Sequence, residues 1–133
     1  MNKRKTTILL VDDDYDYLIQ QKSLLEEQGF NIITSEGGKN IRIIMDNSEI
    51  DVAIVDLMMD DMDSGFILSY EMKKKYPSLP IIMVTGVTNK TGLEFDSITD
   101  SEKQWIKADS IFTKPVRIDQ LVREIKRLLK DDA

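Results

Sequence analysis

Residues 8–14 read ILLVDDD, an unbroken apolar run that stops at three acidic side chains. The same plan returns twice further along the chain, as VAIVD at 52–56 and as IIMVTG at 81–86. Short apolar runs that end abruptly at a polar residue are typical of strands buried on both faces. These three stretches therefore predict the central strands of a parallel sheet.

Segments of helical length separate these strands. The clearest is 118–129, where apolar residues recur at helical spacing and form one stripe. Three further helices are expected at 14–28, 39–47 and 65–76. Two weaker strand candidates cover 31–35 and 110–113. Strands and helices that alternate in this way predict an α/β fold, with a five-stranded parallel sheet, helices on both faces and right-handed crossovers.

The composition narrows the classes of function. With 133 residues we expect one domain over 1–133, with its core at about 6–130 and no output domain. A net charge of -6 argues against direct binding of nucleic acid or of an anionic membrane. The chain has no Cys and no His, which excludes thiol nucleophiles, disulfides and a phosphohistidine. Apolar runs of only four residues exclude a membrane span and a signal peptide, so we expect a cytoplasmic protein.

The polar residues that end the candidate strands are the most informative set. In an open parallel sheet all strands point their carboxyl ends to one edge, where ligands bind. We therefore expect five side chains to meet there: Asp12, Asp13, Asp56, Thr85 and Lys114. Like charges about 4 Å apart repel by roughly 1 kcal/mol even in water, so the carboxylates favour a cation. Because every ligand on offer is an oxygen, the expected cofactor is Mg²⁺.

This set of side chains suits phosphoryl transfer to a carboxylate. Carboxylate nucleophiles form aspartyl-phosphates, and the protein's task is then mainly positioning and charge neutralisation. We interpret Asp56 as the residue that attacks phosphorus. Asp13 and Asp56 would hold the metal directly and Asp12 through water, while Thr85 and Lys114 would contact the phosphoryl oxygens.

At these residues the chain resembles the receiver domain of two-component response regulators, over essentially its whole length. The matching elements are Val11-Asp12-Asp13, Asp56, Thr85 and Lys114-Pro115, each after a candidate strand. The resemblance implies a flavodoxin-like fold with strand order 2-1-3-4-5, and a phosphoryl group passed from a sensor histidine kinase or a phosphotransfer protein to Asp56. It further implies a main-chain carbonyl ligand from Met58 and a cis bond between Lys114 and Pro115.

The resemblance implies a phosphoprotein that acts as a switch and not a turnover enzyme. On this interpretation the phosphoryl group shifts the chain between two conformations, and the chain docks on a downstream protein target or relays the phosphoryl group onward. Whether it forms a homodimer is left open by the sequence.

The chain departs from the family pattern at several places. The usual Met-Pro is Met59-Asp60 here, and the usual Asp-Gly is Asp63-Ser64. The family's switch aromatic, three residues before the lysine, is Ile111. The interval 88–109 is longer than usual, and Thr99 predicts the start of a short helix within it.

Two other functions use some of the same residues. A phosphatase of the haloacid-dehalogenase type would use Asp12 as its nucleophile, followed by Asp14, Thr85 and Lys114. It would lack a late acidic pair for its metal and would leave Asp56 without a role. A degenerate receiver that only binds partners is the other alternative, and the complete set of site residues argues against it.

Overall fold

One parallel sheet of five strands organises the chain, of which the computed structural model describes residues 5–37, 40–56, 64–86 and 109–129. The spatial order of the strands is β2-β1-β3-β4-β5, and every neighbouring pair is parallel. The strands are β1 (Thr7–Asp12), β2 (Asn31–Glu36), β3 (Val52–Asp56), β4 (Ile81–Gly86) and β5 (Ser110–Lys114). This order confirms the predicted fold class.

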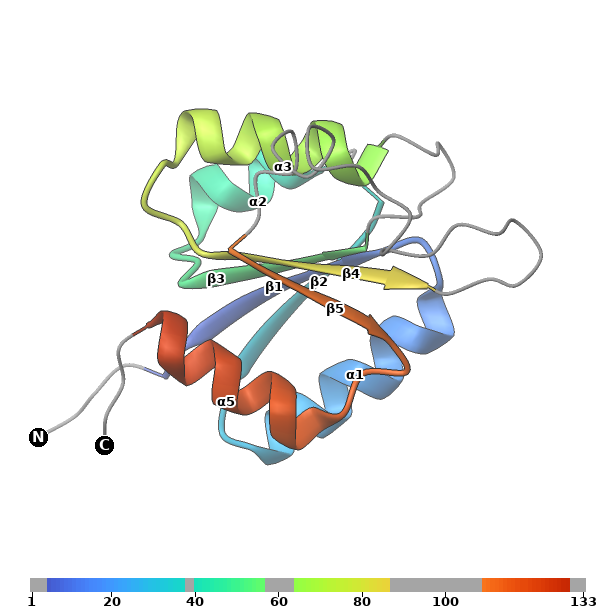
Figure 1. The fold of residues 1–133 in the computed structure, drawn as a ribbon. Helices are drawn as coiled ribbons and strands as arrows, with labels where there is room; N and C mark the ends of the chain where they lie inside the picture. Colours follow the sequence, from blue (N-terminus) through green and yellow to red (C-terminus); the bar gives the residue numbers. More distant parts are fainter. Residues whose placement is uncertain (1–4, 38–39, 57–63, 87–108, 130–133) are drawn as a thin grey trace, which may run out of the picture.

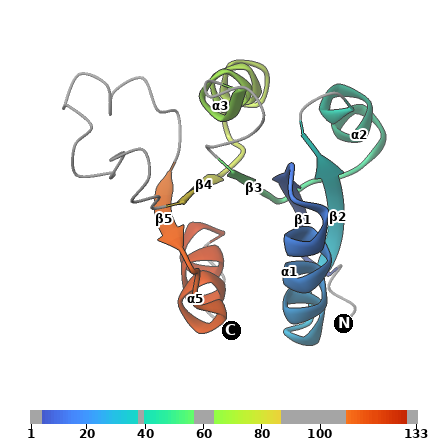
Figure 2. The ribbon, with the colours of Figure 1, turned by 90° about the vertical axis from the view of Figure 1, so that its right-hand side faces the viewer.

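The helices cover both faces of the sheet (Figures 1 and 2). Helices α1 (Tyr15–Glu27) and α5 (Ile118–Leu128) lie on one face, and α2 (Ile41–Asn47) and α3 (Ser64–Lys75) lie on the other. Their bounds agree with the predicted ranges within two residues at each end. The short helix expected after Thr99 lies outside the described residues.

The strands divide their side chains between two cores because successive residues of a strand point to opposite faces. The core under α1 and α5 contains Ile8, Leu10, Ile54, Leu121 and Ile125, among others. The core under α2 and α3 contains Leu9, Val11, Ala53, Val55 and Met72, among others. Burial on both faces explains why the central strands read as continuous apolar runs.

Local sequence signals mark both ends of α1. Asp14 is the N-cap, and its side chain accepts a hydrogen bond from the backbone N–H of Tyr17 at 3.2 Å. After the helix ends, Gly29 adopts a φ of 96°, a left-handed conformation that glycine reaches without steric cost. The cap, together with the hydrogen bond from the Asp14 N–H to Asp12, ties the start of α1 to the end of β1.

Candidate functional site

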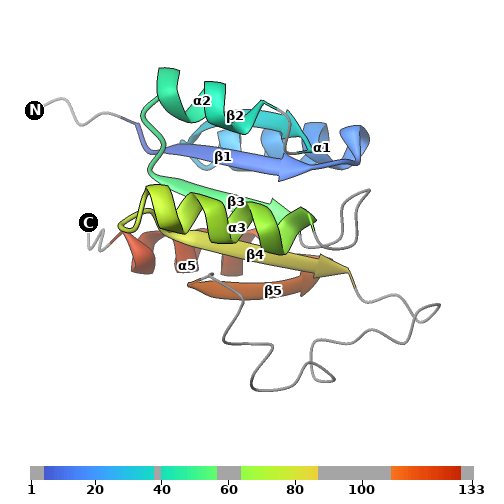
Figure 3. The same cartoon turned by 90° about the horizontal axis from the view of Figure 1, so that it is seen from above.

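The carboxyl ends of four strands meet at one edge of the sheet (Figure 3). β1 ends at Asp12, β3 at Asp56 and β5 at Lys114, and Thr85 is the last residue but one of β4. Asp12 and Asp56 are only 1% and 4% exposed, and Thr85 is 6% exposed. Polar side chains this deeply buried need partners, so their contacts define the site.

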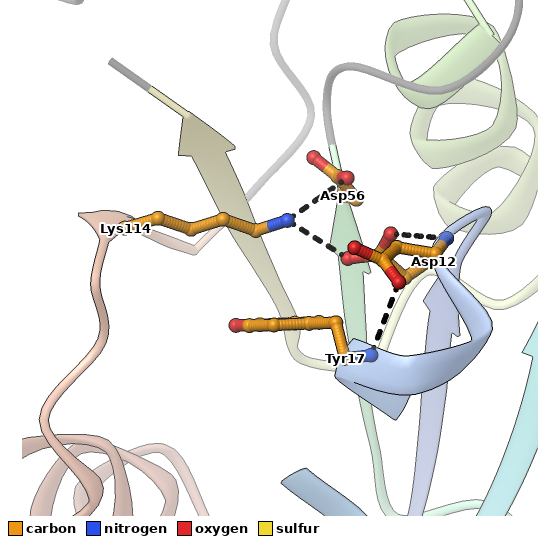
Figure 4. A network of polar contacts seen from close by, with 5 residues as sticks. Asp12, Tyr17, Asp56 and Lys114 are labelled. Atoms are coloured by element: carbon orange, nitrogen blue, oxygen red, sulfur yellow. Dashed lines mark hydrogen bonds and ion pairs between the residues drawn. The ribbon is translucent and has the colours of Figure 1, made fainter. Parts of the chain in front are cut away.

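Lys114 joins the two buried carboxylates. Its ammonium nitrogen lies 3.0 Å from Oδ2 of Asp12 and 3.3 Å from Oδ2 of Asp56 (Figure 4). The other oxygen of Asp12, Oδ1, accepts a hydrogen bond from the backbone N–H of Asp14 at 2.9 Å. Both oxygens of Asp12 are therefore engaged, one by the lysine and one by the turn that leads into α1.

Three carboxylates form a compact acidic cluster at this edge. Asp12, Asp13 and Asp56 each offer one carboxylate oxygen, and these three oxygens lie within 4.8 Å of one another. Asp13 is partly exposed, so the cluster opens to solvent on one side. The formal charges of the three carboxylates and of the Lys114 ammonium beside them sum to -2.

The cluster fits a hard divalent cation. Its donors are all oxygens, which is the ligand type that Mg²⁺ prefers, and Mg²⁺ commonly takes one or two carboxylates and keeps several waters. The formal charge of these four side chains matches that of a divalent ion in size and is opposite in sign, and the partly exposed Asp13 gives the ion an approach from solvent. The residues present therefore suit Mg²⁺ better than a metal that needs nitrogen or sulfur ligands.

The lysine is held in its charged form. Burial alone would lower the pKa of Lys114, but the hydrogen bond to Asp12 and the negative charge of Asp56 outweigh it. The pKa of the ammonium is therefore raised above its ordinary value of 10.5. Lys114 is a permanent positive charge at this site in the physiological pH range.

The structure adds Tyr17, which the sequence did not single out. Its ring centroid lies 4.1 Å from the Lys114 nitrogen, a distance typical of a cation–π contact. Burial raises the pKa of the Tyr17 phenol above 10.0, while the charge of Lys114 opposes that shift. From the sequence, Tyr17 is only a tyrosine in the first turn of a predicted helix. Its spacing gives no indication that it contacts Lys114 at the end of β5.

The structure describes two further predicted site residues, Thr85 and Ile111, and they lie on the neighbouring strands β4 and β5. Thr85 lies on β4, between the strands that carry Asp56 and Lys114. Ile111 lies in β5 beside Met83 of β4 and is partly buried. The Lys114–Pro115 peptide bond is cis, as the resemblance implied. Met58 lies outside the described residues, as does the interval before Asp109.

None of the helices in the described part of the chain combines the length and the apolar character that crossing a bilayer requires.

A family model and curated relatives both match the chain. The model of the response regulator receiver domain matches residues 8–126. The chain is 32% identical over 123 residues to the heme response regulator HssR of Staphylococcus haemolyticus, covering 92% of this chain and 50% of the relative. It is 33% identical over 123 residues to the protein of that name in Staphylococcus epidermidis, with the same two shares. The chain thus spans about half the length of the curated relatives it matches.

Solved structures give the same result. A CheY-like response regulator receiver domain protein from Methanospirillum hungatei superimposes with a TM-score of 0.79 at 26% identity, over 96% of both chains. The response regulator TrrA from Thermotoga maritima, solved in complex with Mg(2+)-BeF, gives a TM-score of 0.75 at 27% identity. That match covers 92% of this chain and 98% of TrrA.

Proposed function

The chain belongs to the response regulator receiver domain family, and from this we propose that Asp56 accepts a phosphoryl group from a sensor histidine kinase or a phosphotransfer protein. A receiver of a two-component response regulator is a signalling switch and not a classical enzyme. The observation that carries the choice of residue is the contact between the Lys114 ammonium and Asp56, made beside the acidic cluster.

In the proposed transfer an oxygen of Asp56 forms a bond to phosphorus. The bond between phosphorus and the donor's histidine nitrogen breaks, and the imidazole leaves with the electron pair. The Lys114 ammonium would turn from the carboxylates to the phosphoryl oxygens, and the Thr85 hydroxyl would donate a hydrogen bond to one of them. The low exposure of Asp56 would keep water from competing with the donor.

The acidic cluster would hold the metal that this transfer needs. Asp13 and Asp56 would bind Mg²⁺ directly and Asp12 through water, with the main-chain carbonyl of Met58 as a further ligand. When bound, Mg²⁺ would neutralise charge on the phosphoryl oxygens. Two features of the chain support this assignment: the all-oxygen donor set and the charge excess of the cluster over Lys114.

Phosphorylation would act by shifting a conformational equilibrium. A change from 1:99 to 99:1 requires about 5.5 kcal/mol of preferential binding to one state, and a smaller shift would still carry a signal. Because Ile111 stands where the family usually has an aromatic residue, we propose that the switch works without an aromatic flip at this position. The active state would dock on a downstream protein target or on a second copy of the chain.

The phosphatase alternative finds no support among the relatives, which are response regulators. The geometry of Asp12 also argues against a nucleophilic role, because one of its oxygens is bound to the Asp14 N–H and the other to Lys114. A nucleophile needs an oxygen directed at its substrate. The choice of Asp56 rests on the family resemblance and on its place beside Lys114 and the acidic cluster.

The proposal is tested by locating the acyl-phosphate. The protein is incubated with acetyl phosphate and Mg²⁺, the adduct is trapped with borohydride, and the modified residue is mapped by mass spectrometry. We expect modification at Asp56, dependence on Mg²⁺, and no adduct in Asp56→Asn. Modification of Asp12, or steady turnover of phosphate esters, would overturn the proposal.

A further inference from the structure

Three groups surround the ammonium of Lys114. The nitrogen lies 3.0 Å from Asp12, 3.3 Å from Asp56 and 4.1 Å from the centroid of the Tyr17 ring. In Figure 4 the ring lies on the side of the ammonium away from Asp56. We propose that Tyr17 is a positioning residue whose ring keeps the Lys114 ammonium in reach of the phosphoryl group on Asp56. This inference rests on the proposed function of Asp56.

Lys114 needs such support because β5 alone does not fix its ammonium. It is the last residue of the strand, its side chain is a flexible four-carbon stem, and it must reach across β4 to contact Asp56. The side chain remains 25% exposed. A hollow adjoins it between α1 and the segment after β5, lined by Tyr17, Gln20, Gln21, Leu24, Pro115 and Val116. Without the ring, the ammonium could turn toward this hollow and bind water there.

Tyr17 is suited to the task because its backbone belongs to the turn that orients Asp12. The N–H of Tyr17 donates to the Asp14 carboxylate at 3.2 Å, and the N–H of Asp14 donates to Asp12 at 2.9 Å. The backbone that carries the ring is therefore tied through Asp14 to one of the two carboxylates that Lys114 contacts. An aromatic face attracts the cation without adding a charge to the site.

The ring, and not the hydroxyl, carries this role. Figure 4 shows the Tyr17 hydroxyl directed away from Asp12 and Asp56, beneath the stem of Lys114. Replacing tyrosine with phenylalanine keeps the aromatic face, whereas leucine removes it at similar hydrophobicity. The two substitutions should therefore differ in their effect on phosphoryl transfer.

The test measures the rate of Asp56 phosphorylation by acetyl phosphate, a donor too small to report on kinase docking. We expect Tyr17→Leu to slow the reaction about fivefold to tenfold, which corresponds to about 1–1.4 kcal/mol. Tyr17→Phe should stay within about twofold of the wild type. Tyr15→Leu, the matched control two residues away, should not change the rate, because Tyr15 is 57% exposed.

A second readout separates positioning from a general loss of structure. The Mg²⁺ affinity of Tyr17→Leu should not be weakened, because the three carboxylates remain, and its circular dichroism should match the wild type. A double-mutant cycle of Tyr17→Leu with Lys114→Met, measured by urea unfolding, tests the coupling of the two side chains. Tyr17→Leu should lower the free energy of unfolding less in the Lys114→Met background than in the wild type. Should Tyr17→Leu fail to fold, Tyr17→Met removes the same ring with a more adaptable side chain.

The inference is overturned if Tyr17→Leu phosphorylates at the wild-type rate, if Tyr17→Phe is as slow as Tyr17→Leu, or if the cycle shows no coupling to Lys114. These outcomes are distinct from a failure of the proposed function. If the proposed function fails, the wild-type protein itself shows no phosphoryl group on Asp56.

Discussion

The ammonium of Lys114 lies 3.3 Å from the carboxylate of Asp56, although β4 separates the strands that carry them. The same ammonium reaches the carboxylate of Asp12 on β1, one strand further. The side chains of Asp12 and Asp56 are only 2% and 5% exposed, so water stabilises their charges poorly. Lys114 therefore links the ends of three strands by offsetting the cost of burying two negative charges.

Replacing Lys114 with methionine keeps an unbranched side chain of nearly the same length and removes its charge. We expect Lys114→Met to lower the free energy of unfolding by about 1–3 kcal/mol at neutral pH without Mg²⁺, because two buried carboxylates lose their shared cation. Urea unfolding followed by circular dichroism measures this difference. Mg²⁺ should restore part of the loss by supplying positive charge at the same place.

Lys126→Met is the matched control for this change. Lys126 is exposed in the last turn of α5, so its loss should alter stability by no more than about 0.5 kcal/mol. A Lys114→Met protein as stable as this control in Mg²⁺-free buffer would show that the two carboxylates do not depend on the lysine.

Asp13→Asn tests whether the acidic cluster binds a divalent cation. In Mg²⁺-free buffer we expect the variant to be more stable than the wild type by about 1 kcal/mol, because one of three clustered negative charges is removed. Added Mg²⁺ should stabilise the wild type by about 2.7 kcal/mol at a hundred times its dissociation constant, and the variant much less. Thermal unfolding across a Mg²⁺ titration measures both effects.

Asp16→Asn provides the comparison, since Asp16 is an exposed acid of the first turn of α1 and not a member of the cluster. It should keep the wild-type response to Mg²⁺. An equal response in Asp13→Asn would mean that the ion binds elsewhere.

The pH dependence of stability has a contribution from Glu124 on α5. Both of its carboxylate oxygens accept hydrogen bonds from Arg127, each at 2.7 Å, and it also accepts one from the Ser110 hydroxyl. The hydrogen bonds from Arg127 lower the pKa of Glu124 below its ordinary value of 4.5; burial opposes that shift and Ser110 adds to it. The folded state therefore favours the ionised carboxylate.

The sign of the effect follows from that direction. A group whose pKa is lowered by folding stabilises the protein above its unfolded pKa, and that stability is lost as the pH falls through the folded value. Glu124→Gln should therefore be less stable than the wild type at about pH 6, and the difference should shrink as the pH drops below 4.5. Urea unfolding of both proteins between about pH 6 and about pH 3 measures it, and a difference that grows on acidification would contradict the prediction.

The apolar runs predicted the sheet and much of the site because both depend on where strands end. Once the apolar runs at 8–11 and 52–55 are strands of one parallel sheet, Asp12 and Asp56 must arrive at the same edge. The strand order is harder to predict from the sequence than the strands themselves, since the same alternation of strands and helices is compatible with several orders. The resemblance to the receiver family implies the order 2-1-3-4-5, and the pairing of neighbouring strands confirms it.

Tyr17 shows what the sequence could not supply. Helical periodicity places a residue on one face of its own helix, but it does not predict which side chain from another element that residue contacts. The contact with Lys114 depends on the angle between α1 and the sheet and on the rotamer of a long side chain. Both are set by packing throughout the core and not by local spacing.

The packing of α5 gives a prediction that separates the core from the site. Ile125 is fully buried among the residues under α1 and α5, so Ile125→Ala should lower the free energy of unfolding by about 2–5 kcal/mol. Ile19→Ala, at a position 45% exposed on α1, should cost far less. The Mg²⁺ affinity of Ile125→Ala should stay at the wild-type value under conditions where it is folded, because the acidic cluster is held by the ends of β1 and β3 and the turn after β1. Urea unfolding measures the stability and Mg²⁺ titration of the same samples measures the affinity. If Ile125→Ala also weakened Mg²⁺ binding, the packing of α5 would help to set the geometry of the carboxylates, and the strand ends alone would not.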